Sequence, residues 1–154
     1  MSDHSLTGRI PVAALVLGLA GLIPFAAGAA SLWVRLPLLP PETGLQLVVV
    51  YGAIILSFLG GIRWGTAIGP YDAGRQAPEF AASVMGSLAG LSAAFLPAIP
   101  ALALLIAGFL VQGLWDVMSV DSGRLPGWFG RLRMILTAGV VVALVAALLA
   151  VFAI

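Results

Sequence analysis

The residues YGAIILSFLGGIRWG, from Tyr51 to Gly65, place a single arginine near the end of a long apolar stretch. The apolar residues extend back to Leu45, which makes the stretch long enough for a helix that crosses a bilayer. A charge at the centre of an inserted helix costs roughly 2.5 to 3.5 kcal/mol, and less toward the helix ends. Arg63 therefore needs a partner or must reach the interface, and it marks a candidate polar site in a membrane span.

Composition supports the membrane class. Hydrophobic residues make up 62% of the 154 residues and charged residues only 8%. A soluble core could not bury so much apolar surface, so we expect one integral membrane domain over residues 1–154 with membrane lipids as partners. The net charge of +1 and the lack of basic runs argue against nucleic-acid binding. Cysteine is absent, which excludes disulfides and thiolate chemistry.

Apolar stretches of about 20 residues predict an all-α polytopic bundle of about five transmembrane helices. Their approximate bounds are 11–34, 45–68, 80–96, 101–118 and 133–154. Pro24 should kink or locally unwind the first span. Pro97 and Pro100 cannot both lie inside a continuous helix, so the third and fourth spans should form a tight antiparallel hairpin.

The arginines predict the orientation. With an odd number of spans, the N-terminus and the loops after the second and fourth spans lie on one side and carry most of the arginines, namely Arg9, Arg75, Arg124, Arg131 and Arg133. The other side carries only Arg35. Because arginine-rich loops stay cytoplasmic, we expect the N-terminus inside and the C-terminus outside.

A cleaved signal peptide is the alternative interpretation of the first span, since Ala27-Gly28-Ala29 has the small residues of a cleavage site. The apolar stretch is longer than a usual signal core, and Asp3 stands beside a single Arg9 in the preceding tail. We therefore expect the first span to be retained.

Small residues recur at every fourth position in two neighbouring spans. The second span has such a stripe at Ala53, Ser57, Gly61 and Gly65, and the third has one at Ala82, Gly86, Gly90 and Ala94. Helices associate in lipid where small residues let their backbones approach, so the two spans should pack together, chiefly through Ser57, Gly61, Gly65, Gly86 and Gly90. Chance spacing in a chain rich in glycine and alanine is the alternative.

Arg63 lies about 200° around the helix from Gly61, so it should face a different neighbour. Gly108, Gln112 and Asp116 follow one line along the fourth span and form a polar ridge that ends at the depth of Arg63. We expect Arg63 and Asp116 to pair, while the alternative is that each extends separately into the headgroups.

The candidate polar focus at this end of the bundle comprises Arg63, Trp64, Gln112, Trp115, Asp116, Arg131 and Arg133. Arginines and aromatic rings gathered at one depth could hold a lipid phosphate or a quinone head. A simple interfacial anchor is the alternative.

Signatures of catalysis are missing from the sequence. The only histidine is His4, and neither a nucleophile elbow nor a phosphate-binding loop occurs. Asp116 and Asp121 could face a common loop, but two carboxylates without a third ligand more often belong to a helix end and a solvated turn. We therefore expect no enzyme, no cofactor and no metal site.

The segment from Leu17 to Phe25, the Tyr51–Gly65 stretch and Trp115-Asp116 together resemble a known family. A looser late match is LPGWF, from Leu125 to Phe129, followed by Arg133. The chain is similar over nearly its whole length to the transmembrane protein 69-like family of small multi-pass membrane proteins of unknown function. The resemblance implies an inner-membrane protein of bacterial or mitochondrial type with its first span retained, and it supplies no activity.

Three classes of function fit these features. We favour an accessory or assembly component of a larger complex in the bacterial inner (cytoplasmic) membrane, because small loops and small-residue faces suit a protein that contacts other integral membrane subunits. The second class is a small transporter or channel, with Arg63, Gln112 and Asp116 along its pathway. The third is a lipid- or quinone-binding membrane protein.

Overall fold

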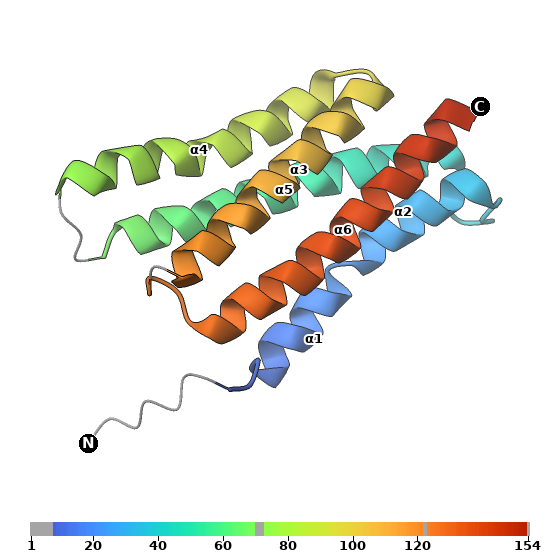
Figure 1. Cartoon of the computed structure of the whole chain (residues 1–154). Coiled ribbons are helices and arrows are strands. Elements are labelled where there is room, and N and C mark those ends of the chain that lie inside the picture. Colours follow the sequence, from blue (N-terminus) through green and yellow to red (C-terminus); the bar gives the residue numbers. More distant parts are fainter. Residues whose placement is uncertain (1–7, 70–72, 122, 154) are drawn as a thin grey trace.

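The computed structural model describes residues 8–69, 73–121 and 123–153, and the regular structure of these residues is helical (Figure 1). The helices are α1 (Val12–Ala20), α2 (Ile23–Trp33), α3 (Pro41–Ala67), α4 (Ala73–Phe95), α5 (Ala98–Asp121) and α6 (Gly127–Ala153). The prediction of an all-α membrane bundle is confirmed. The first predicted span corresponds to α1 and α2 together, and each of the other four corresponds to one helix.

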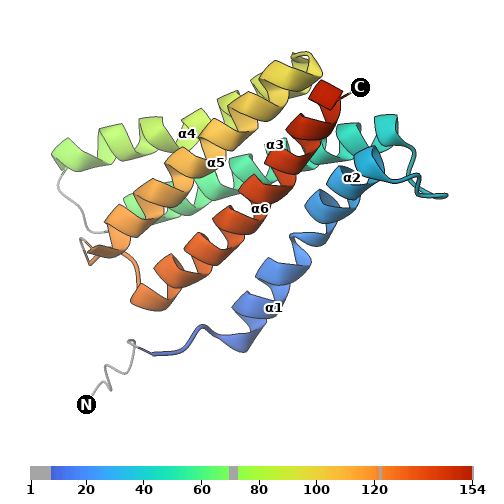
Figure 2. The same ribbon diagram turned by 45° about the vertical axis from the view of Figure 1, so that its right-hand side comes forward.

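The break between α1 and α2 occurs next to Pro24, as the sequence predicts. Gly21 and Leu22 separate the two helices, and Pro24 lies in the first turn of α2. Proline has no N–H to bond the carbonyl four residues earlier, and its ring collides with that carbonyl. The helix is therefore interrupted here, and α2 follows α1 after a break in the ribbon with a slight bend (Figure 2).

The predicted hairpin connects α4 and α5 through a short turn. Phe95 ends α4 and Ala98 begins α5, so Pro97 precedes the new helix. Pro100 fits in the first turn of α5 because a proline there gives up no intrahelical hydrogen bond. The helix α4 begins at Ala73, seven residues before the predicted position 80, and it contains Pro78.

The helix α3 is the centre of the bundle. It packs against α2, α4 and α5, while α6 packs against α5 and α2, and α1 contacts α6. The start of α1, the end of α3 and the end of α5 lie at one end of the bundle, and the C-terminal end of α6 lies at the other (Figures 1 and 2). We call the first end the arginine end, because Arg9, Arg63, Arg124, Arg131 and Arg133 belong to it.

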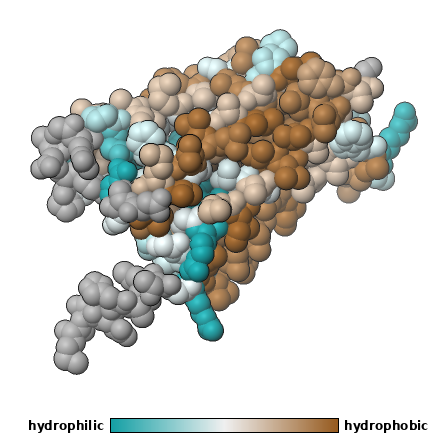
Figure 3. Space-filling view, viewed as in Figure 1, coloured by the Kyte–Doolittle hydropathy of each residue, from teal (hydrophilic) through white to brown (hydrophobic). Residues whose placement is uncertain are grey.

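The distribution of side chains is that of a membrane protein. Large hydrophobic residues are exposed along every helix, for example Val12, Phe58, Met85, Leu114 and Val142, while Arg63, Gln112, Asp116 and Arg133 are buried. Figure 3 shows the hydrophobic surface along the helices and hydrophilic residues toward the ends of the bundle. A water-soluble protein has the opposite arrangement, whereas lipid solvates apolar surface.

Four helical segments of the described residues have the length and hydropathy of a membrane span: Val12–Trp33, Pro41–Ala67, Ala98–Val120 and Gly127–Ala153. The helix α4 falls outside this group because it carries more polar residues. Its polar and small residues Ser83, Gly86 and Gly90 are buried, and Met85 and Leu88 are exposed. This inside-out pattern suits a helix with its outer face in lipid.

The predicted packing of α3 on α4 is present, but it uses a different set of α3 residues. A Cβ atom added at Gly60 would come within 2.1 Å of the Ser83 carbonyl oxygen, and one at Gly90 within 2.8 Å of the Ala53 carbonyl oxygen. At Gly86 the distance to the Leu56 carbonyl oxygen would be 2.7 Å. The two backbones therefore touch, as close packing in lipid requires.

Gly61 and Gly65 take no part in this contact, which corrects the prediction for these two residues. A Cβ atom at either would meet no described residue within 4 Å, and both residues are exposed. A stripe with a spacing of four drifts about 40° around the helix at each step, because a turn takes 3.6 residues. The α4 contact follows Ala53, Ser57 and Gly60 instead, and Ser57 Oγ lies 2.8 Å from Ser87 Oγ.

Candidate functional site

The arginine end contains a buried polar cluster formed by α3, α5 and α6. Its members are Arg63 of α3, Gln112 and Asp116 of α5, and Arg133 of α6, all less than a tenth exposed. The ridge predicted on α5 is therefore directed inward. Gly108, on the same line, lets Leu56 of α3 pack against the α5 backbone, since a Cβ there would lie 2.7 Å from Leu56 Cδ2.

Asp116 pairs with Arg133 rather than with Arg63. The Arg133 Nε donates a hydrogen bond of 2.6 Å to Asp116 Oδ2, and both side chains are less than a tenth exposed. Among the described residues, Arg63 forms no ion pair within 4.0 Å. The expected Arg63–Asp116 pair is therefore wrong as a direct contact, because the first turns of α6 bring a second arginine closer to the carboxylate.

Arg63 is buried and stacks on an aromatic ring. Its guanidinium carbon lies 4.0 Å from the centre of the Trp115 ring, which is a cation–π contact. Its Nε and Nη2 have no hydrogen-bond partner among the described residues. The charge of Asp116 still attracts Arg63 over a longer distance. With only 6% of its surface exposed, Arg63 does not extend into the headgroups, so that alternative is also wrong.

Two members of the predicted focus lie outside the cluster. Trp64 is 47% exposed and packs on Phe80 of α4, with ring centres 4.6 Å apart. Arg131 is also exposed, and its Nη2 donates a hydrogen bond to the carbonyl oxygen of Gly8. Residues one and two positions apart differ by about 100° and 200° around a helix, so Trp64 and Arg131 turn away from Arg63 and Arg133.

A second ion pair at this end was not predicted. The Arg124 Nη1 donates to Glu79 Oε1 at 2.5 Å, which ties α4 to the segment between α5 and α6. Glu79 was placed outside the third span because the apolar stretch begins at Phe80. The spacing of Glu79, Ser83 and Gly86 on one face of a helix is the signal that could have revealed a polar inner face of α4.

The cluster has no composition suited to a metal ion. Within residues 8–69, 73–121 and 123–153, no three His, Cys, Asp or Glu side chains are placed to hold one. What the described cluster offers is buried arginine nitrogen atoms with unused hydrogen-bonding capacity, on Arg63 and Arg133. Such donors suit an oxygen-bearing head group.

Comparisons with known proteins identify a family whose function is unknown. Residues 10–149 match a family described as protein of unknown function (DUF3429). The chain is 39% identical over 152 residues to transmembrane protein 69 of Xenopus tropicalis, an alignment that covers 90% of this chain and 54% of the relative. It is 46% identical over 55 residues to transmembrane protein 69 of Mus musculus, which covers 36% of this chain and 22% of that relative.

The chain thus spans about half the length of the Xenopus relative, and less of the mouse one is matched. No solved structure matches it significantly. The family match covers most of the sequence, including the break in the first span, the Arg63 segment and the Asp116–Arg133 pair. The chain therefore belongs to the DUF3429 family of proteins of unknown function, which is the transmembrane protein 69-like family expected from its sequence.

Proposed function

We propose that this membrane protein is an accessory or assembly component of a larger complex in the bacterial inner membrane. The observation that supports this role is the uncovered part of the small-residue stripe on α3. Gly61 and Gly65 leave open space above the backbone, and they lie on a face of α3 that is otherwise apolar and exposed, with Phe58 and Ile68.

An exposed pair of glycines four residues apart suits contact with another membrane helix. In lipid, an apolar side chain gains little by leaving the acyl chains, so association depends on close approach of helix backbones. Within this chain, the backbones of α3 and α4 approach closely in this way at Gly60, Gly86 and Gly90. At Gly61 and Gly65, a helix of a partner subunit could approach the α3 backbone equally closely from the lipid side.

The proposed orientation places the arginine end in the cytoplasm. The structure has the start of α1 and the ends of α3 and α5 at this end, and the loops nearby carry arginines. Arginine-rich loops are retained on the cytoplasmic side, which gives an N-terminus inside and a C-terminus outside. The proposal includes no enzymatic step, cofactor or metal ion.

Native mass spectrometry of the tagged chain, extracted in mild detergent from its own membrane, tests the role. We expect a reproducible assembly that contains at least one other integral membrane protein. The variant Gly61→Leu with Gly65→Leu should remove that protein and leave the chain folded, because both positions are exposed and a Cβ atom at either meets no described residue within 4 Å. A lone chain or a homo-oligomer from wild-type membranes would contradict the proposal.

The matched control is Met134→Ile, at an exposed position of α6. Its side chain keeps about the same volume in lipid, so the assembly should survive. Loss of the partner in this control as well would mean that the glycine face is not the contact.

A further inference from the structure

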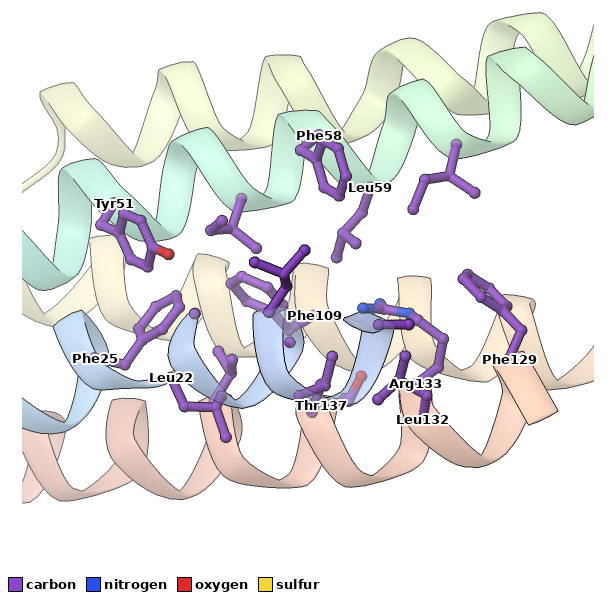
Figure 4. A pocket seen from close by; sticks show the side chains of 18 residues that line it. Leu22, Phe25, Tyr51, Phe58, Leu59, Phe109, Phe129, Leu132, Arg133 and Thr137 are labelled. Atoms are coloured by element: carbon purple, nitrogen blue, oxygen red, sulfur yellow. The ribbon is translucent and has the colours of Figure 1, made fainter. Parts of the chain in front are cut away.

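An apolar cavity lies between the α1–α2 bend, α3 and α6, and Phe109 of α5 also lines it. Its volume is about 400 Å³, which is within the range of small-ligand sites. Figure 4 shows Phe25 and Tyr51 toward one end of the cavity and Phe129 toward the other. Leu22, Leu59 and Leu132 also line it, so most of its wall is hydrocarbon.

A charged side chain projects into this apolar space. Arg133 lines the cavity with only 5% of its surface exposed, and its guanidinium group points into the cavity in Figure 4. Its Nε is used by Asp116, but its Nη2 is buried with no hydrogen-bond partner among the described residues. A buried donor without a partner is costly, so an acceptor atom in the cavity would be bound strongly.

The local charges favour an anion as that acceptor. Asp116 is hydrogen-bonded to Arg133 and also attracts Arg63. Glu79 attracts Arg63 as well, but it is paired with Arg124. The formal charge of these five side chains is positive. A neutral head group would leave this charge uncompensated, whereas an oxyanion would balance it.

The position of the cavity fits a lipid of one leaflet. Its wall on α6 runs from Phe129 near the start of the helix to Val140, a helix length of about 16 Å at 1.5 Å per residue. This is about half of the roughly 30 Å of a hydrocarbon core. The arginine lies toward the arginine end and the apolar wall extends toward the bilayer centre, as the head and chain of a lipid do.

We propose that this cavity binds an anionic membrane lipid, with one hydrocarbon chain between α1 and α3 and its phosphate or carboxylate on Arg133. Pro24 lies at the bend that separates α1 from α3. The backbone of α1 packs on α6 at Gly18, where an added Cβ would lie 2.8 Å from Leu136 Cδ1. Phe58 borders both this cavity and the glycine face on α3, but the variants that test the two proposals change different residues, so either proposal can fail without the other.

The test uses the purified full chain in nanodiscs made from phosphatidylglycerol and phosphatidylcholine in equal amounts. After transfer to mild detergent, native mass spectrometry measures how much of each lipid the protein retains. We expect phosphatidylglycerol to be retained about tenfold more than phosphatidylcholine. Both lipids carry a phosphate that can accept a hydrogen bond from Arg133, but the choline of phosphatidylcholine adds a positive charge that the buried arginines repel. Equal retention of the two lipids would overturn the proposal.

Two variants locate the site. Ala14→Phe places a ring in the cavity wall on α1 and should abolish retention, while Ala13→Phe is the matched control on the exposed side of the same turn. Arg133→Gln with Asp116→Asn removes the guanidinium donor together with its partner and should reduce the preference for phosphatidylglycerol, while the charge of Arg63 remains. Thermal unfolding in detergent shows which variants are folded. Retention unchanged in folded Ala14→Phe would place the lipid elsewhere and overturn the site.

A parallel sample with added oleate distinguishes the two sources of the oxyanion. Oleate that displaces phosphatidylglycerol identifies a free fatty acid as the better occupant, and failure to displace it identifies a phospholipid; both results agree with an anionic lipid. A neutral quinone retained by protein from its own membrane, and lost in Ala14→Phe, would overturn the anionic head.

Discussion

The helix α3 meets α4 and α1 in opposite ways. Against α4 its backbone is in contact, because Gly60, Gly86 and Gly90 remove the side chains that would separate the two helices. Between α3 and α1 lies the cavity, and α1 packs on α6 instead. The two halves of the first span therefore pack differently: α2 lies close against α3, and α1 is separated from α3 by the cavity.

The difference shows how the membrane changes the usual packing argument. Water would drive the apolar walls of the cavity together, but lipid can fill such a space without that cost. Close contact arises only where small residues permit it, as at Gly28 and Gly44, where an added Cβ would lie 2.7 Å and 3.0 Å from backbone oxygen atoms of the other helix. The α1 side of α3, where the cavity lies, is the open side, and the α4 side, where Gly60 approaches Ser83, is the closed side.

The largest effect on the free energy of unfolding is expected in the buried polar cluster at the arginine end. Asp116→Ala removes the hydrogen-bonded partner of Arg133 and the charge that attracts Arg63. Breaking a buried ion pair on one side costs about 3 to 5 kcal/mol. We expect the free energy of unfolding in mixed detergent micelles to fall by about this amount.

A double-mutant cycle identifies which arginine is the partner. Arg133→Ala and Asp116→Ala should show a coupling energy well above that of Arg63→Ala and Asp116→Ala, because of these two arginines it is Arg133 that hydrogen-bonds the carboxylate. A coupling for Arg63 as large as that for Arg133 would contradict the assigned pair.

On the closed side, Gly60→Ala should lower the free energy of unfolding by a smaller amount. The new methyl group would lie 2.1 Å from the Ser83 carbonyl oxygen, so α3 and α4 must move apart. Overpacking of this kind costs about 1 to 3 kcal/mol. Gly61→Ala is the matched control, because its methyl group meets nothing within 4 Å in the part of the chain that the structure describes.

The control should be neutral or stabilising by up to about 1 kcal/mol, since alanine favours helix more than glycine does. Unfolding in the same micelles measures both variants. Equal losses for the two glycines would mean that the closed side does not depend on backbone contact.

The sequence was sufficient for the helices, the bend at Pro24 and the hairpin at Pro97, because each depends on local chemistry. Long apolar stretches require helices in lipid, and proline interrupts them wherever it stands. The sequence also predicted the position of the polar cluster along the helices, since Arg63 and Asp116 both lie toward the arginine end and attract each other.

The sequence could not predict which side chains contact one another between the helices of the bundle. Choosing between Arg63 and Arg133 as the partner of Asp116 requires the rotation of α6 about its axis, which the nearly uniform apolar sequence of that helix does not define. The same limitation affected Gly61 and Gly65. The sequence does not define which row of small residues on α3 faces α4, and the predicted row lies next to the one that makes the contact. The cavity depends on the path of α1 relative to α3, and no local pattern encodes that path.

The smallest effect is expected from Ser57→Ala, which removes the hydroxyl hydrogen bond to Ser87 on the closed side. Hydrogen bonds between membrane helices contribute about 0.6 kcal/mol on average, because the separated helices find other partners. A cycle with Ser87→Ala in mixed micelles should give a coupling of about this size, well below the loss from Gly60→Ala. A coupling above the Gly60→Ala loss would show that polar contacts hold α3 and α4 together. The expected order assigns that role to backbone packing, which is the feature that the α1 side lacks.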